Sequence, residues 1–243
     1  MSDGRGRGKL HVPFLAGRNK NLDRRGCRPG KSSGNKGVII AREGIAYVLV
    51  PAFVAVVLVV VGLWPIAVVF AILAAFMAYF FRDPRRVAPS DSSVVVAPAD
   101  GRVTRVKPVE DQNENSATVV SIFLSPFDVH INRAPIAGKI TNVSYTRGKF
   151  LMATDENSSV VNEQNALTIE GEKITVVCKQ IAGILARRIV CWKQAGESLA
   201  LGERFGLIKF SSRTDLLLPA NVEVLVSEGA RVKGGTTIIG RIR

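Results

Sequence analysis

The chain has 243 residues, 47% of them hydrophobic, which allows one folded domain with additional segments and excludes a disordered chain. The formal net charge is +13 at pH 7. Residues 1–43 hold eleven Lys or Arg against three Asp or Glu, so this tail carries +8 and the other 200 residues carry about +5. The charge therefore does not indicate a basic nucleic-acid-binding surface on the folded part.

The segment 1–43 is rich in Gly, Arg, Lys, Asn and Ser, and it has too few apolar residues to bury a core, so we expect it to be disordered. Its basic residues are not interleaved with aromatic residues, as the binding of single-stranded nucleic acid would require. Attraction to anionic headgroups, on the order of 1 kcal/mol per basic residue near the surface, explains the composition better. We expect a lipid bilayer, and no nucleic acid, as a partner.

The segment 44–82 contains an uncharged apolar run that ends at Phe81. A spanning helix needs roughly 20 apolar residues, so the run predicts two short helices, 45–63 and 66–81, with a turn between them. A cleaved signal peptide and a buried soluble helix pair are the alternatives, and both are disfavoured by the length of the run. We therefore expect a hydrophobic α-helical membrane hairpin, and a re-entrant arrangement stays open.

Basic residues flank the hairpin, with Arg42 before it and Arg82, Arg85 and Arg86 after it. Positive charge favours the cytoplasmic face of a membrane, so both ends of the hairpin should lie there. We expect a protein of the cell membrane with the domain that follows the hairpin on the cytoplasmic side. The hairpin is expected to act as an anchor and to contribute no functional side chain.

From residue 83 onward the sequence predicts an all-β domain. Short β-branched runs are separated by glycine-containing turns, and Val222, Val224 and Val226 show the alternation of a half-buried strand. We expect a small sandwich or barrel with one or two short helices, one of them near residues 147–154. The end of the chain, VSEGARVKGGTTIIGRI, resembles the hairpins of lipoyl and biotinyl carrier domains but lacks their Met-Lys-Met tip.

Cysteine and histidine are scarce. Cys27, Cys178 and Cys191 show no C-x-x-C spacing, and a cytoplasmic domain should keep them as free thiols. His11 and His130 are the two histidines of the chain, and no cluster with the spacing of metal ligands is visible. We expect no metal site.

Five stretches stand out against the β pattern, and their order along the chain is informative. They are FRDPRR (81–86), PADGRV (98–103), LSPFDVHINRAP (124–135), QIAGILARRI (180–189) and GERFGLIKFSSRTDLLLP (202–219). In this order they resemble the successive signatures of the short-chain phosphatidylserine decarboxylase family, from about residue 81 to the C-terminus. The resemblance implies a self-processing, pyruvoyl-dependent proenzyme that converts phosphatidylserine to phosphatidylethanolamine and carbon dioxide in phospholipid biosynthesis.

The resemblance places the cleavage site in KFSSRTD, between Ser211 and Ser212. In the family, a serine attacks the preceding carbonyl to form an ester, elimination releases the upstream chain, and hydrolysis leaves a pyruvoyl group. Carried over to this sequence, Ser212 is the attacking residue and the precursor of the covalent cofactor. The large subunit would be 1–211, with its catalytic part at 83–211, and the small subunit 212–243. Ser211 departs from the usual glycine, which bears on the cleavage rate because glycine permits more backbone geometries.

Asp100 and His130 match the positions of the family's functional residues. A serine hydroxyl needs a positioned base and a strained or polarised carbonyl, and histidine exchanges protons near neutral pH. Asp100 is expected to orient His130, as the third group does in a serine triad. Longer family members have a second histidine where this chain has Arg133. Either His130 therefore serves both self-processing and protonation of the product, or Asp100 acts without it in one step.

Arg133, Arg187 and Arg188 are candidates for holding the phosphate or carboxylate of the substrate, because a guanidinium binds such anions through two hydrogen bonds. Ordinary surface charge is the alternative. Two other functions stay open: a membrane-tethered β-domain that binds partners without catalysis, and a pyruvoyl enzyme for a soluble amino acid. Asp100, His130 and Ser212 together disfavour the first, and the hairpin disfavours the second. A homo-oligomer of the processed heterodimer is left open.

Overall fold

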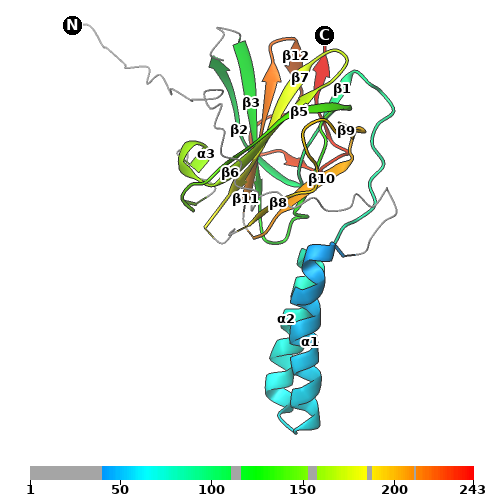
Figure 1. Cartoon of the computed structure of the whole chain (residues 1–243), viewed down its shortest axis with the longest axis vertical. Helices are drawn as coiled ribbons and strands as arrows, with labels where there is room; N and C mark the ends of the chain where they lie inside the picture. Colours follow the sequence, from blue (N-terminus) through cyan, green and yellow to red (C-terminus); the bar gives the residue numbers. More distant parts are fainter. Residues whose placement is uncertain (1–39, 111–115, 153–157, 185–187, 211) are drawn as a thin grey trace, which may run out of the picture.

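The computed structural model describes residues 40–110, 116–152, 158–184, 188–210 and 212–243. The tail that is expected to be disordered lies almost entirely before residue 40 and therefore outside the described residues, as do Cys27, Arg187 and Ser211. Two apolar helices come first and a β-domain follows, in the predicted order (Figure 1).

The two helices lie side by side as a hairpin that projects from the β-domain (Figure 1). A short 3-10 turn, η1 (Arg42–Gly44), leads into α1 (Ile45–Val60), and α2 (Trp64–Phe80) follows after a tight turn. Gly62 adopts a φ of 81° in that turn, a conformation that residues with side chains resist. Pro65 lies in the first turn of α2, where its missing N–H removes no helical hydrogen bond.

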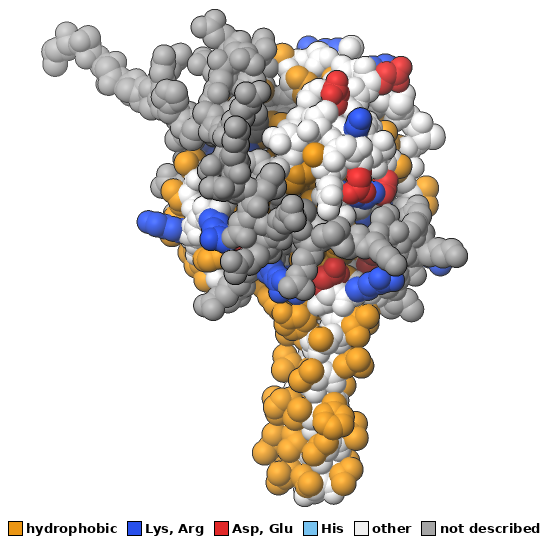
Figure 2. All heavy atoms as spheres, viewed as in Figure 1, with side chains coloured by type: hydrophobic (Ala, Val, Ile, Leu, Met, Phe, Trp, Pro, Cys, Tyr) orange, Lys and Arg blue, Asp and Glu red, His pale blue; other side chains and the backbone are white. Residues whose placement is uncertain are grey.

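The surface of the hairpin is apolar along its length, and Figure 2 shows it as an orange stalk. Leu49, Phe53 and Val60 are 61%, 69% and 81% exposed, respectively. Among the described residues, Arg42–Val60 is the one helical segment long and apolar enough to cross a membrane, with 19 residues, whereas α2 is shorter. Soluble proteins rarely expose so large an apolar surface, so the hairpin supports association with a membrane.

The β-domain contains three sheets in the described part of the chain. The largest has the strand order β13-β2-β3-β11-β7-β6-β5-β9, and the two smaller sheets have the orders β1-β14-β12 and β4-β10-β8. Every pairing between these strands is antiparallel, which confirms the prediction of a mostly β domain behind two helices. The strands are β1 (Val94–Val96), β2 (Gly101–Glu110), β3 (Ser116–Leu124), β4 (Ile131–Arg133), β5 (Gly138–Thr146), β6 (Gln164–Glu170), β7 (Thr175–Ala182), β8 (Ile189–Cys191), β9 (Ser198–Leu199), β10 (Arg204–Ile208), β11 (Ser212–Pro219), β12 (Val222–Val224), β13 (Arg231–Val232) and β14 (Ile238–Ile242).

One short helix, α3 (Ser158–Val161), lies between β5 and β6. The helix predicted near residues 147–154 is wrong for the described residues of that range, 147–152, which contain no helix. The physical reason is a set of contacts with Asn162: Lys149 forms a β-bridge to it, and the backbone N–H and C=O of Leu151 each bond to its side-chain amide at 2.9 Å. These partners satisfy the backbone without helical hydrogen bonds.

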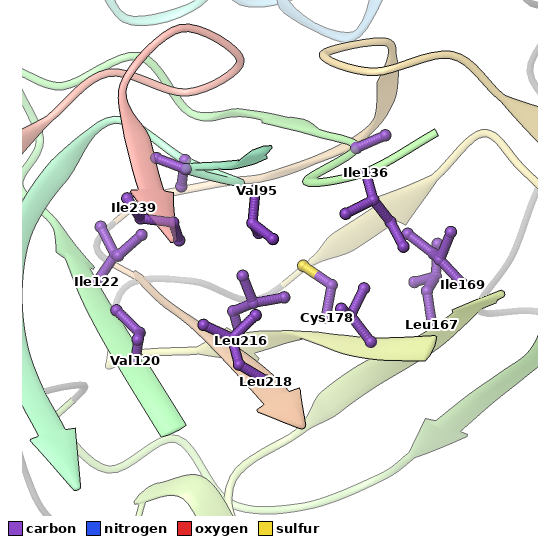
Figure 3. Close-up of a cluster of buried hydrophobic side chains, with 14 of the residues drawn as sticks. Val95, Val120, Ile122, Ile136, Leu167, Ile169, Cys178, Leu216, Leu218 and Ile239 are labelled. Atoms are coloured by element: carbon purple, nitrogen blue, oxygen red, sulfur yellow. The ribbon is translucent and has the colours of Figure 1, made fainter. Parts of the chain in front are cut away.

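The main core lies between the eight-stranded sheet and the sheet that contains β1 and β14 (Figure 3). Alternate residues of the strands point inward, as the two-residue period of a strand requires. On β3 these are Val120, Ile122 and Leu124, and on β11 they are Leu216 and Leu218, all fully buried. The core also includes the buried residues Cys178 and Cys191, whose thiols form no disulfide among the described residues; this agrees with the free thiols predicted for them.

A second core joins the hairpin to the β-domain. Phe80 and Phe81 are buried against Val129, Ile131 and Leu207. The backbone supports this junction, since the N–H of residue 41 donates to the carbonyl of Phe81 at 2.8 Å. The boundary expected between residues 82 and 83 thus lies beside a core that both parts share.

Candidate active site

Ser212 is the first residue of β11, a strand in the interior of the large sheet. It pairs with Leu124 of β3 on one side and with Ala182 of β7 on the other. Its side chain is fully buried, and its Oγ has no hydrogen-bond partner in the described structure. Buried hydroxyls almost always have a partner, so an unpaired one at this position requires an explanation.

The segment just before Ser212 contains an unusual backbone conformation. Phe210 has a φ of 58°, the only positive value recorded for a non-glycine residue in the described part of the chain. A bulky side chain in this left-handed region costs on the order of 1–3 kcal/mol, and such residues persist where their surroundings enforce them. The ring of Phe80 stacks on that of Phe210 at 4.5 Å between centroids and holds the side chain of this residue in place. Strain is therefore held two residues before Ser212.

His130 lies in the loop before β4, and its tautomer follows from its single hydrogen bond. Its Nδ1 is 2.9 Å from the backbone carbonyl oxygen of Asp128. A carbonyl oxygen only accepts, so Nδ1 carries the proton and donates it. Nε2 is then the unprotonated nitrogen, and it is buried without a hydrogen-bond partner among the described residues. His130 therefore presents a free basic lone pair.

The surroundings of His130 keep the ring neutral. Only 3% of the residue is exposed, and the ring of Phe80 lies 4.2 Å from the imidazole, centroid to centroid. Burial lowers the pKa of His130 to about 4, and Arg82 acts in the same direction, against the opposing effect of Asp128. At neutral pH the ring is uncharged, as a general base must be before it accepts a proton.

His130 and the segment before Ser212 lie beside each other. The N–H of Ile208 donates to the backbone carbonyl of His130 at 3.2 Å. The ring of Phe80 contacts the rings of both His130 and Phe210. No hydrogen bond between His130 and Ser212 is present among the described residues, and each keeps one unsatisfied side-chain atom.

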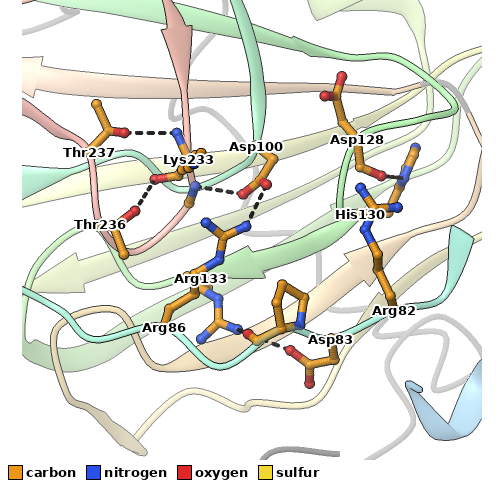
Figure 4. A network of polar contacts seen from close by, with 12 residues as sticks. Arg82, Asp83, Arg86, Asp100, Asp128, His130, Arg133, Lys233, Thr236 and Thr237 are labelled. Carbon is orange, nitrogen blue, oxygen red and sulfur yellow. Dashed lines mark hydrogen bonds and ion pairs between the residues drawn. The ribbon is translucent and has the colours of Figure 1, made fainter. Parts of the chain in front are cut away.

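Asp100 lies in the turn before β2 and has partners other than His130. One carboxylate oxygen accepts from Arg86 at 2.7 Å and the other from the backbone N–H of Gly234 at 2.7 Å. Burial raises the pKa of Asp100, while Arg86 and Gly234 partly offset this effect. Figure 4 shows Asp100 and His130 apart, without a contact between them. The structure thus does not place Asp100 where it would orient His130; the carbonyl of Asp128 does so instead.

The three candidate arginines have different surroundings. Arg133 is buried and donates to the Asp83 carboxylate at 3.0 Å and to the carbonyls of Pro84 and Gly202 at 3.0 and 3.2 Å. A substrate anion would have to displace Asp83 to bind its guanidinium. Arg188 is exposed, and Arg187 lies outside the described residues.

Two buried polar groups close to Ser212 were not found from the sequence. Arg213 and Asp215 form a buried ion pair with two hydrogen bonds, at 2.8 and 2.9 Å. On the other face of β11, the hydroxyl of Thr214 accepts from Asn132 at 3.0 Å, and Asn132 accepts from Gln180 at 2.9 Å. Thr214 shares its strand face with Ser212, since residues two apart point the same way. Asn132 and Gln180 lie within the stretches INR and QIAG. Their position in these motifs is the feature of the sequence from which they could have been found.

The comparisons with known proteins identify the family. A family model described as phosphatidylserine decarboxylase matches residues 73–240. A phosphatidylserine decarboxylase proenzyme of Symbiobacterium thermophilum is 49% identical over 209 residues, covering 84% of this chain and 96% of that protein. Proteins of the same name from Geotalea uraniireducens and Solibacter usitatus are 42% and 50% identical, covering 85% and 72% of this chain and 98% and 83% of the relatives.

The chain belongs to the phosphatidylserine decarboxylase family. The resemblance inferred from five ordered motifs is confirmed, and with it the assignment of the chain as a lyase of phospholipid biosynthesis that is made as a proenzyme. The match begins at residue 73, inside α2, so the segment shared with this decarboxylase family includes Phe80 and Phe81. The end of the hairpin is therefore part of the family's common segment.

Proposed function

We propose that this chain makes its own covalent pyruvoyl group from Ser212 by cutting itself between Ser211 and Ser212, and then decarboxylates phosphatidylserine to phosphatidylethanolamine. The observation that supports this proposal best is the buried, unpaired Oγ of Ser212 on an interior strand. A structural serine there would be expected to bond to a neighbouring group, whereas a nucleophile has to keep its oxygen available.

The self-cleavage step requires a base and a vulnerable peptide bond. Ser212 Oγ attacks the carbonyl carbon of Ser211, forming a C–O bond while the C–N bond breaks. We assign to His130 Nε2 the removal of the hydroxyl proton, which then passes to the departing amine. The strain at Phe210 supports this step, because the segment before the cut starts from a raised energy. Residue 212 then loses its α-proton, and its bond to the ester oxygen breaks, which releases chain 1–211 as a carboxylate. Hydrolysis of the dehydroalanine that remains gives the pyruvoyl group and ammonia.

The surroundings of Ser212 suit a pyruvoyl group, because the residue is fully buried and its hydroxyl is not committed to another partner. When present, the group supplies the electron sink that carbon dioxide loss requires. The side chains around it exclude water, and His130 can hold the proton that the product carbon takes up. Asp100 is proposed as the acid or base of a separate step, since Arg86 and Gly234, and not His130, are its partners.

The proposed partners follow from the same arrangement. The large and small subunits stay together because β11, which begins with Ser212, is hydrogen-bonded to β3 and β7 of the large subunit. The apolar hairpin is proposed to hold the enzyme in the cell membrane, with the catalytic domain on the cytoplasmic side. Arg133, Arg187 and Arg188 are carried forward as candidate substrate-binding residues, with Arg188 the exposed one among those described.

The intact mass of the purified protein tests the proposal directly. We expect two chains, 1–211 and 212–243, the smaller one with a pyruvoyl group in place of its N-terminal serine. A single chain of 243 residues in a preparation that still decarboxylates phosphatidylserine would overturn the proposal.

A further inference from the structure

The exposed ring of Phe127 lies against the apolar hairpin. Phe127 belongs to the β-domain, in the loop between β3 and β4, and 66% of the residue is exposed. Its ring meets that of Phe76 edge-on, with 6.4 Å between the centroids and 79° between the planes. Phe76 is in α2, so this contact brings a side chain of the β-domain alongside the hairpin.

Phe127 occupies the tip of a tight turn. The N–H of Asp128 donates to the carbonyl of Ser125 at 2.9 Å, which closes a β-turn around Pro126 and Phe127. One carboxylate oxygen of Asp128 also accepts from the N–H and the hydroxyl of Ser125, at 2.8 and 2.6 Å. Proline fixes the φ that the second position of such a turn requires. None of these bonds uses the ring of Phe127, so the turn keeps its shape while the ring stays exposed.

Arg82 connects this turn to the end of α2. One guanidinium nitrogen donates to the carbonyl of Phe127 at 2.7 Å, and the other terminal nitrogen donates to the carbonyl of Tyr79 at 2.8 Å. The guanidinium also lies over the ring of Tyr79, 3.8 Å from its centroid. The turn therefore cannot move away from α2 without the loss of a charge-assisted hydrogen bond.

These contacts define the depth of Phe127 relative to a membrane. Tyrosine and arginine at the end of an apolar helix lie at the level of the lipid headgroups, so Tyr79 and Arg82 mark that level on α2. Phe76 precedes Tyr79 by three residues, which places it about 4.5 Å further into the bilayer along the helix. A ring beside Phe76 thus lies at the boundary between headgroups and acyl chains, the depth of interfacial aromatic side chains.

The surroundings of Phe127 indicate that lipid covers it. A single exposed phenylalanine is ordinary on a protein surface. Phe127, however, continues the apolar surface of α2: Ile72 and Leu73, one turn before Phe76, are 65% and 40% exposed. A bilayer that surrounds these side chains reaches the ring of Phe127 as well.

We propose that the turn Ser125–Asp128 is a second membrane contact, which inserts Phe127 among the lipid headgroups and sets the height of the β-domain above the bilayer. The turn adjoins the proposed base, because Nδ1 of His130 donates to the carbonyl of Asp128 at 2.9 Å (Figure 4). Insertion of Phe127 therefore holds His130 close to the headgroups that carry the substrate's carboxylate. The inference rests on the proposed function, since it takes the hairpin as the anchor and a membrane lipid as the substrate.

The depth of position 127 can be measured in full-length protein reconstituted in phosphatidylcholine bilayers. Ser212→Ala keeps the chain uncut, and Cys27→Ser removes the cysteine of the tail, while Cys178 and Cys191 are buried. A fluorophore on Phe127→Cys should lose its fluorescence to lipids with a spin label close to the headgroup. A fluorophore on Phe53→Cys, in the middle of α1, should lose it to lipids labelled deep in the acyl chain.

Leu225→Cys provides the matched control for this measurement. Leu225 is apolar and 51% exposed like Phe127, but it follows β12, at the end of the β-domain opposite the hairpin (Figure 1). Its fluorophore should keep its fluorescence with every lipid. Quenching at position 53 without quenching at position 127 would overturn the inference and leave the anchor intact. Absence of quenching at both positions would overturn the anchor as well.

The second measurement compares two forms of the substrate, in processed protein with an intact Ser212. Phe127→Ser removes the ring and keeps the backbone bonds of the turn. The KM for phosphatidylserine in vesicles should rise about tenfold, as the loss of one buried phenylalanine ring predicts, and the KM for a short-chain, water-soluble phosphatidylserine should stay within about twofold. Phe127→Trp should keep the low KM, because tryptophan favours the headgroup region.

The kinetic outcomes separate the membrane from the site. An equal rise in KM for both substrates would overturn the inference, because the turn would then act through the geometry of His130. An unchanged KM for both would also overturn it, since the height of the β-domain would not depend on the ring. Leu225→Ser should change neither KM. Failure of the proposed chemistry would show separately, as an uncut parent protein, and the depth measurement on Ser212→Ala protein would still report on Phe127.

Discussion

The ring of Phe80, the last residue of α2, lies 4.2 Å from the imidazole of His130, centroid to centroid, with 34° between the two planes. The same ring stacks on Phe210 at 4.5 Å. A residue of the apolar hairpin thus covers the proposed base and packs against the strained residue before the proposed cleavage site. Phe80 is therefore a neighbour both of His130, whose pKa is lowered, and of Phe210, whose φ is positive.

Replacement of Phe80 should change the pH dependence of self-cleavage. Phe80→Leu keeps part of the apolar volume but removes the ring, so water reaches His130 and its pKa rises from about 4 toward its ordinary value. A base acts in its neutral form, so cleavage in the parent protein should fall only as the pH approaches 4. In the variant it should already fall below about pH 6. The rate at which the small subunit appears after synthesis, measured across this range, checks the expectation.

Phe53→Leu is the control for Phe80→Leu, since Phe53 is 69% exposed on α1 and distant in sequence from the proposed site. It should leave the pH profile unchanged. An unchanged profile in Phe80→Leu, with cleavage at the parent rate, would show that Phe80 neither desolvates His130 nor supports Phe210.

The stability of the protein should depend on pH through His130. The pKa of His130 is lowered to about 4 in the folded state, so between pH 4 and its ordinary value of 6.5 the unfolded chain binds more protons. Stability therefore falls as the pH drops through this window, by about 2 kcal/mol at pH 5. In His130→Gln this contribution is absent, while the amide still donates to the Asp128 carbonyl. Denaturant midpoints of both proteins, measured in the uncut Ser212→Ala background, give the difference. If the denaturant midpoints of both proteins changed equally with pH, the assignment of a neutral, buried His130 would be contradicted.

The cleavage pair can be separated by single substitutions. Ser212→Ala should leave one uncut chain without decarboxylase activity, because the attacking oxygen and the precursor of the pyruvoyl group are lost together. Ser211→Ala should still process, since the nucleophile stays in place. Ser211→Gly should process at least as fast, because glycine adopts more backbone geometries at the cut. Denaturing electrophoresis reports all three. Two fragments and full activity from Ser212→Ala would show that another residue is the nucleophile.

The sequence predicted the features that are local or carried by contiguous motifs. The apolar run gave the hairpin, the alternation of Val222, Val224 and Val226 gave a strand, and KFSSRTD directed attention to Ser212. Contacts between distant parts of the chain could not be derived. Phe80 and His130 are 50 residues apart, and an apolar residue at the end of a helix looks like any other membrane residue until its partner is known.

The expected Asp100–His130 pair illustrates the same limit. Two motifs can indicate the residues of a site, but they do not show which of these side chains contact each other in the folded chain. The partner of Asp100 proved to be Arg86 of FRDPRR, and Asp83 of the same motif binds Arg133. Periodicity cannot distinguish such ion pairs from solvent-exposed charge.

A chain that starts at Asp83 is the sharpest test of how the hairpin and the β-domain depend on each other. The motifs alone suggest that such a chain folds and cleaves itself like the full protein, because it contains every proposed catalytic residue. The structure leads to the opposite expectation for cleavage. The truncation removes Phe80 and Phe81 from the shared core, and loss of one buried phenylalanine alone costs about 3–5 kcal/mol. It also exposes His130 and releases Phe210 from its stacking partner, so self-cleavage should be much slower.

A second truncated chain that starts at Ala74 distinguishes anchoring from support of the site. It lacks α1 and half of α2 but keeps Phe80 and Phe81, so it should recover self-cleavage and activity on a short-chain, water-soluble phosphatidylserine. Its activity on bilayers should stay low, because without the full hairpin the enzyme is no longer concentrated at the membrane. Cleavage of the Asp83 chain at the full-length rate would show that the hairpin is an anchor and nothing more. Failure of both chains to cleave would assign an essential role to α1, whose Tyr47 stacks on Phe81 at 5.4 Å.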